Sequence, residues 1–240
     1  MINMRNVLAS VAIAGVAMVG AVLPAAAGSE TGNFMVRLQG TVVAPDSSAD
    51  VTVNGAPLAG ADAEVSSEFV PTATLTYFLN QNLAVELLCC FAKHSIDGKG
   101  TIAGLNEIAD TWIFPPAVTV QYHFNDMGGF KPYVGAGVQY IAFFDEGVGD
   151  NALGASHVTI DDAFGFTLQA GVDVSLGGGW YLNADVKKTF LDTTVTWHDT
   201  ALGTVRGDAQ IDPLIVSAGI GYRFNLEDIF GHRGSDIPLK

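Results

Sequence analysis

The chain repeats one pattern after an apolar first segment: apolar and polar residues alternate over stretches of about ten residues, and turn-forming residues separate the stretches. The first stretch shows it clearly. Phe34, Val36, Leu38 and Val42 fall on one side, and Arg37, Gln39 and Thr41 fall on the other. Because successive side chains of a β-strand point to opposite faces, this alternation predicts a strand with one apolar and one polar face.

Seven further stretches alternate in the same way, which predicts eight strands in all. They cover residues 72–79, 83–93, 118–124, 133–140, 164–174, 180–189 and 214–224.

The connections between these strands alternate in length. Three are tight turns, at 80–82, 125–129 and 176–179; four are longer polar or glycine-rich stretches, at 44–67, 94–114, 145–161 and 193–209. Outer-membrane barrels keep short turns on the periplasmic side and longer loops outside. Residues 28–224 are therefore predicted to form an all-β fold, an eight-stranded antiparallel up-and-down transmembrane β-barrel with both termini in the periplasm.

The composition of the polar face indicates that it points into the barrel. It carries five glycines, at 135, 137, 171, 219 and 221, and sparse charges of both signs, at Arg37, Glu86, Lys131, Asp173, Asp185, Lys187 and Arg223. A narrow eight-stranded interior has to be filled by side chains, so small residues beside charged ones suit a packed lumen. A water-soluble barrel would turn its apolar face inward instead.

The apolar face also carries aromatic residues near the strand ends, as an interfacial girdle would. They are Phe34, Tyr77, Tyr122, Phe124, Trp180, Tyr222 and Phe224. The alternative is that these are ordinary strand formers in a core. With the alternating connections, the aromatic positions favour the membrane.

The two ends of the chain are read as separate segments. Residues 1–27 have the form of an export signal: Arg5 precedes an apolar run, and small residues end at Ala27. The alternative is a permanent membrane anchor, for which the apolar run is short. Residues 225–240 follow the last strand and are expected to be a periplasmic extension, which either contacts a partner, caps the barrel or is a disordered end.

Charge and motifs exclude several other functions. With 25 Asp and Glu against 11 Lys and Arg, the chain lacks the clustered cations that nucleic acid requires. Cys89 and Cys90 are adjacent and no zinc or redox motif accompanies them. The five histidines have no paired metal-site spacing, and no nucleophile elbow or phosphate loop occurs. We therefore expect no cofactor, no metal and no enzymatic activity.

Several short stretches carry a family resemblance through their number, order and spacing. They are 36–38, 82–88, 114–116, 121–124, 131–137, 168–173, 182–186 and 219–224. Together they resemble the outer membrane protein W (OmpW) family. One departure is that members of that family typically end at the final aromatic, where Tyr222-Arg223-Phe224 resembles the signal read by the barrel assembly machinery, whereas this chain continues to Lys240.

The resemblance implies a narrow hydrophobic channel that passes small apolar molecules across the outer membrane of a Gram-negative bacterium. Outer-membrane lipid, lipopolysaccharide, small hydrophobic solutes and the barrel assembly machinery are the expected partners; the oligomeric state is not predicted. The residues expected to line the lumen or channel are Leu88, Cys90, Tyr133, Tyr181, Arg37, Glu86, Gln121 and His123. Any one of these side chains is as well explained by simply filling the barrel. The alternative function is a structural or surface-receptor barrel that acts through its extracellular loops without transport.

Overall fold

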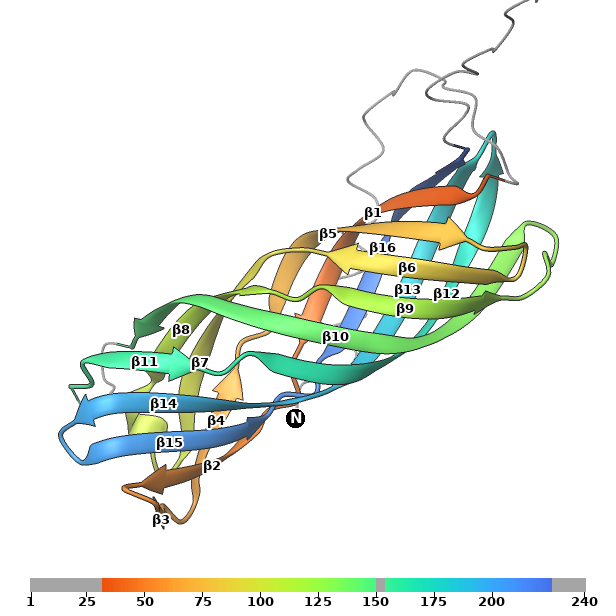
Figure 1. Ribbon diagram of the computed structural model, residues 1–240. Coiled ribbons are helices and arrows are strands. Elements are labelled where there is room, and N and C mark those ends of the chain that lie inside the picture. Colours follow the sequence, from red (N-terminus) through yellow and green to blue (C-terminus); the bar gives the residue numbers. More distant parts are fainter. Residues whose placement is uncertain (1–31, 150–153, 226–240) are drawn as a thin grey trace, which may run out of the picture.

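Eight antiparallel strands close into a barrel in a computed structural model that describes residues 32–149 and 154–225 (Figure 1). These strands are β1 (Phe34–Ala44), β5 (Glu68–Phe78), β6 (Leu83–Cys89), β9 (Ala117–His123), β10 (Phe130–Val148), β12 (Ala163–Gly177), β13 (Trp180–Phe190) and β16 (Leu214–Phe224). Pairing of β1 with β16 and of β10 with β12 completes the circle. The predicted eight-stranded antiparallel barrel is confirmed.

Three tight turns join β5 to β6, β9 to β10 and β12 to β13 at one end of the barrel, which we call the turn end. Side chains and glycines shape them. The Asn80 side-chain oxygen accepts hydrogen bonds from the amides of Asn82 and Leu83, at 2.9 and 2.8 Å. Gly128 and Gly177 have φ angles of 73° and 83°, which residues with a Cβ rarely adopt.

The four long connections are not loops, which corrects the sequence-based expectation. They form further strands that prolong the wall at the other end, and we call this part, with the last third of β10, the dome. Its strands are β2 (Ser48–Val53), β3 (Ala56–Pro57), β4 (Ala61–Val65), β7 (Ala92–Gly100), β8 (Glu107–Phe114), β11 (His157–Ile160), β14 (Asp192–Thr200) and β15 (Gly203–Gln210); a short 3₁₀ helix, η1 (Ala103–Leu105), lies between β7 and β8.

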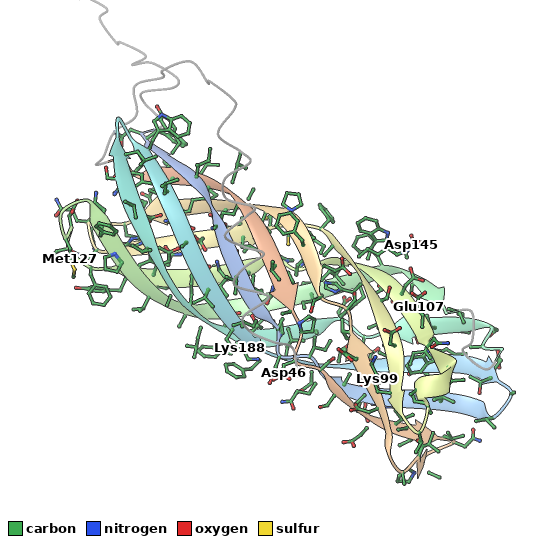
Figure 2. The ribbon with its side chains drawn as sticks, turned by 180° about the vertical axis from the view of Figure 1, so that it is seen from behind. Asp46, Lys99, Glu107, Met127, Asp145 and Lys188 are labelled. Atoms are coloured by element: carbon green, nitrogen blue, oxygen red, sulfur yellow. The ribbon has the colours of Figure 1, made fainter. Side chains whose placement is uncertain are left out.

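Two sheets make up the dome. One has the order β11-β14-β15-β2-β3, and the other continues from β10 through β8 and β7 to β4. Figure 2 shows the extent of the molecule: Met127 lies at the turn end, Lys99 and Glu107 lie on the dome, and Asp46 and Lys188 lie between.

The outer surface of the barrel is apolar, as the alternation predicts. Leu38, Val120 and Leu168 point outward and are about half exposed, and the outward apolar residues of β16 are partly exposed. At the turn end the aromatic side chains touch one another: the Phe34 and Tyr77 rings are 4.9 Å apart and those of Trp180 and Tyr222 are 4.7 Å apart. Such a surface fits acyl chains bounded by an aromatic belt.

None of the described helices is long and apolar enough to cross a membrane. The predicted signal peptide of residues 1–27 lies outside the described residues, and so does nearly all of the predicted extension of residues 225–240.

Candidate functional site

The lining of the barrel changes from charged to apolar along its axis. The run from β13 into β14 shows the change within one continuous series of inward-facing positions. Asp185 and Lys187 lie in the barrel, Leu191 follows, and Val195 and Trp197 lie in the dome; all five are buried. The interior therefore has a polar half toward the turn end and an apolar half under the dome.

Arg37 lies at the centre of the polar half. Its guanidinium group donates to Asp173 through two nitrogens, at 3.1 and 2.7 Å, and to Glu86 at 2.8 Å. It also donates to the Thr76 hydroxyl at 2.6 Å. Arg37 is completely buried, so these acceptors replace the water that a buried cation loses.

Lys187 extends this ionic network toward the dome. Its ammonium group lies 2.6 Å from Asp185 and 3.2 Å from Glu86. The Gln169 amide nitrogen donates to the same two carboxylates, at 3.0 Å to Glu86 and 2.7 Å to Asp185. We call Arg37, Glu86, Gln169, Asp173, Asp185 and Lys187 the plug.

The other predicted lumen residues that carry polar groups surround the plug. Tyr133 donates to Asp185 at 2.8 Å, and its ring lies under the Arg37 guanidinium group, 5.5 Å from the ring centre. Gln121 donates to Gln169 at 3.2 Å and contacts the His123 ring at 2.9 Å. Tyr181 lies nearer the turn end, in a cluster with Met35, Phe78 and Ala84. These residues fill the barrel and do not line the apolar half.

A glycine leaves the space that the Tyr133 ring occupies. A Cβ placed on Gly171 would lie 2.5 Å from Tyr133 Cζ and would overlap the hydroxyl as well. The inward glycines of the sequence therefore make room for large polar side chains in a narrow barrel.

A layer of hydroxyl groups separates the plug from the apolar half. Thr41 bonds Thr72 at 2.6 Å and Ser217 at 2.9 Å. On the opposite wall Thr167 bonds Thr189 at 2.8 Å, and Thr189 donates to Gln139 at 2.7 Å. Hydrogen bonds thus continue along both walls up to the floor of the dome.

An apolar cavity of about 150 Å³ lies above this layer, inside the dome. Its wall includes Ala92, Ile96 and Ile141, and Thr41, Thr72 and Gln139 form its polar floor. Two of the predicted channel residues, Leu88 and Cys90, line it. A cavity of roughly 150 Å³ with apolar walls stays dry and accommodates a molecule of the size of benzene.

Trp197 ties the two dome sheets together across the interior. Its indole nitrogen, on β14, donates a 2.8 Å hydrogen bond to the Ile108 carbonyl oxygen, on β8. Its ring also packs with Ile96 and Val158 in an apolar cluster. Trp197 and the other dome residues were not predicted as site residues, because their segments were expected to be loops.

The barrel wall is interrupted beside the cavity. β5 pairs with β1 up to Glu68, but its pairing with β6 ends at Ala73 opposite Cys89. The stretch from Glu68 to Thr72 is therefore paired with β1 on one side and with no described strand on the other. Pro71 within it has no amide hydrogen to donate. We call this break in the ladder, between the stretch and β7, the side gap; Val70 and Ala92 pack in one buried cluster on its inner side. Beyond it, the wall resumes where the Ser66 amide donates to the Ser95 carbonyl at 2.9 Å.

Within the described residues, no group of three or more His, Cys, Asp or Glu side chains is arranged to hold a metal ion. Cys89 and Cys90 are free thiols. The site that remains is the apolar cavity above a charged plug.

The comparisons agree with this architecture. The sequence profile of the OmpW family matches residues 30–224. The chain belongs to the OmpW family. Among its relatives, the uncharacterized outer-membrane protein y4mB of Sinorhizobium fredii is 35% identical over 85% of this chain and 86% of its own. Outer membrane protein W of Vibrio cholerae is 33% identical over 81% of this chain and 90% of its own.

A solved structure has the same fold. The crystal structure of the outer membrane protein OprG from Pseudomonas aeruginosa is similar with a TM-score of 0.76, at 30% identity, over 82% of this chain and 98% of that one. The protein is therefore an outer-membrane β-barrel of a Gram-negative type.

Proposed function

We propose that the protein takes small apolar molecules from outside the cell into the dome cavity and releases them sideways, through the side gap, into the lipid of the outer membrane. The observation that carries this proposal is the position of the cavity: an apolar space lies directly above a charged, packed plug. The dome then faces the exterior, and the turns and both termini face the periplasm, as short turns do in outer-membrane barrels.

The cavity offers an apolar solute a lower free energy than water does. Removing apolar surface from water contributes about 25 cal/mol for each Å², so burying roughly 200 Å² of a small aromatic molecule contributes about 5 kcal/mol. Lipopolysaccharide resists the entry of such molecules because its outer part is charged and hydrated. A cavity that extends from the barrel into the dome supplies an entry point.

The plug makes the axial route unfavourable. A solute moving along the axis would separate Arg37 from Glu86 and Asp173, and a buried ion pair that loses one partner costs about 3–5 kcal/mol. An apolar solute has no charged or hydrogen-bonding group that could replace the lost partners. The side gap avoids the plug, because the gap lies at the level of Leu88, Cys90 and Ala92, which already line the cavity.

The termini have a further expected partner. β1 and β16 end together at the turn end, where Phe34 pairs with Phe224. We propose that Tyr222-Arg223-Phe224 is read from the periplasmic side by the barrel assembly machinery, although the chain continues beyond it.

The test is uptake of radiolabelled p-xylene by whole cells with intact lipopolysaccharide. Ala92→Phe puts a ring into the cavity beside the side gap, whereas Lys93→Phe puts the same ring one position along, on the outer surface where the Lys93 side chain is 52% exposed. Uptake is expected to fall with Ala92→Phe to the level of cells lacking the protein, and to stay unchanged with Lys93→Phe. Equal surface amounts of both variants are checked by cell-surface labelling. Uptake that is indifferent to Ala92→Phe, or to loss of the protein, overturns the proposal.

A further inference from the structure

One buried side chain gives the apolar cavity a specific polar contact. His94 lies on β7 between the inward-facing residues Ala92 and Ile96, and it lines the cavity with them. Only 4% of it is exposed. An imidazole at such a position needs partners for its ring nitrogens, because a buried polar atom without one is destabilising.

The wall fixes the tautomer of this ring. Nδ1 lies 2.9 Å from the carbonyl oxygen of Ser66, which can only accept a hydrogen bond. Nδ1 therefore carries the hydrogen. Burial lowers the pKa of His94 below its usual 6.5, against the weaker opposing effects of the Ser66 hydrogen bond and of Glu68, so the ring is neutral at pH 7. In a neutral imidazole with hydrogen on Nδ1, Nε2 is a hydrogen-bond acceptor.

The acceptor Nε2 is left for an occupant of the cavity. His94 makes no hydrogen bond through Nε2 to any residue that the structure describes. Nor is the atom sealed inside the protein: among the described residues, the buried side-chain atoms without a partner are Gln39 Oε1 and Thr74 Oγ1, both in the barrel. Nε2 is thus not one of these sealed atoms, and His94 is a lining residue of the cavity.

Three hydroxyl groups of the cavity wall direct their hydrogens at backbone carbonyl oxygens. Thr111 donates to the Trp112 and Phe144 carbonyl oxygens, Thr193 donates to that of Asp161, and Thr200 donates to that of Gly203. These oxygens, like His94 Nε2, can accept but have no hydrogen free to give. His94 therefore favours an occupant that donates a hydrogen bond over one that only accepts.

We propose that the cavity selects apolar molecules bearing one hydroxyl group, such as phenols and medium-chain alcohols, by accepting the hydroxyl hydrogen at His94 Nε2. This inference rests on the proposed function and names its preferred solutes. A hydrocarbon enters the same cavity without this bond. An ether or ester of the same size has no hydrogen to donate and gains nothing from His94.

Three probes of similar shape separate these cases: p-xylene, p-cresol and 4-methylanisole. Their binding to the full protein in lipid nanodiscs is measured by equilibrium dialysis of radiolabelled compound, with empty nanodiscs subtracted for partition into lipid. His94→Phe keeps a ring and removes both nitrogens. His94→Asn keeps a donor near the Nδ1 position for Ser66 and removes the acceptor at Nε2. Ile96→Val is the control, because it enlarges the cavity at the same wall without changing a polar group.

In both His94 variants p-cresol binding is expected to weaken about 10-fold, because its hydroxyl group then has no partner in an apolar space. Binding of p-xylene and of 4-methylanisole should stay within about twofold of the wild type, the scatter expected when no hydrogen bond is gained or lost. Ile96→Val should change all three alike. If His94→Phe misfolds, the result with His94→Asn decides.

The outcomes distinguish the two proposals. If p-xylene and p-cresol both bind and neither His94 variant weakens p-cresol selectively, the selection by His94 is wrong while the uptake of apolar molecules stands. If none of the three probes binds the wild-type protein beyond the empty nanodiscs, the proposed function fails, and the selection fails with it.

Discussion

The indole nitrogen of Trp197 and the carbonyl oxygen of Ile108 lie 2.8 Å apart. Their strands, β14 and β8, belong to different sheets, which this hydrogen bond joins. The bond crosses the inside of the dome, from β14 to β8. We call this bond the strut. It limits the width of the cavity, since the walls cannot separate without breaking it.

Trp197→Phe tests the strut. The change should destabilise the dome by about 1–3 kcal/mol, because the Ile108 carbonyl loses its side-chain partner in an apolar surrounding. Hydrogen exchange measured by mass spectrometry should then show faster exchange in β8 and β14 and unchanged exchange in the barrel strands. Trp112→Phe is the matched control, since Trp112 lies on β8, the strand of Ile108, but is 39% exposed. Equal effects of the two changes would contradict a strut.

The boundary between membrane and dome can be located by charge. Val120→Arg places a cation at an outward, half-exposed position of the barrel and should cost about 2–4 kcal/mol if acyl chains surround it near the midplane. Thr204→Arg places the same cation on the exposed surface of the dome and should cost within about 0.5 kcal/mol of zero. Urea unfolding of each variant in lipid vesicles measures both. A small cost at Val120 would mean that water, and not lipid, meets that face.

The plug should dominate the stability of the barrel. Arg37→Met leaves Glu86 and Asp173 buried without their common cation, and we expect a loss of about 3–5 kcal/mol in the free energy of unfolding. Arg206→Met removes an arginine from an ion pair with Asp208 whose side chains are 55% and 56% exposed. That change should cost at most about 1 kcal/mol. The same urea assay compares them, and similar losses would show that the plug charges are solvated after all.

Stability should depend on pH through His94. Because burial holds its pKa below 6.5, the unfolded chain binds a proton in the range between the two pKa values while the folded chain does not. Stability at this residue is therefore complete above pH 6.5 and falls as the pH is lowered through that range. The pH dependence of unfolding should be shallower in His94→Asn than in the wild type. An identical dependence would show that His94 already carries its proton when folded.

The sequence predicted the barrel because each strand in the membrane repeats the same alternation. Leu182, Ala184 and Val186 face outward and Asn183, Asp185 and Lys187 face inward, as expected from the pattern. Lipid demands this arrangement along every strand, so even weak single segments support one another.

The dome could not be predicted because the same positions continue to face inward while their residues change from polar to apolar. Beyond Leu191 the inward positions become apolar, as at Val195 and Trp197, and the outward ones become polar, as at Thr194 and Thr196. Water replaces lipid outside, so the two faces exchange their chemistry. Alternation with the apolar residues inward and the polar residues outward, sought beyond the aromatic residues, would have identified these strands.

The candidate site was only partly accessible from sequence for a related reason. Leu88 and Cys90 line the cavity, but Tyr133 and Tyr181 belong to the barrel below it. Inward direction follows from alternation, whereas height along the axis depends on strand tilt and register, which one sequence does not give. His94 begins the stretch 94–114, which was predicted to be a loop, so its inward direction on β7 was not predicted.

The pairing of Phe34 with Phe224 has a consequence for how the molecule is made. The first strand finds one of its two neighbours only when the last strand has arrived, so closure joins residues from opposite ends of the chain. Contacts of such long sequence separation slow folding, and until they form, both terminal strands expose unpaired edges that invite aggregation. Closure between β1 and β16 is therefore the step that removes both edges at once.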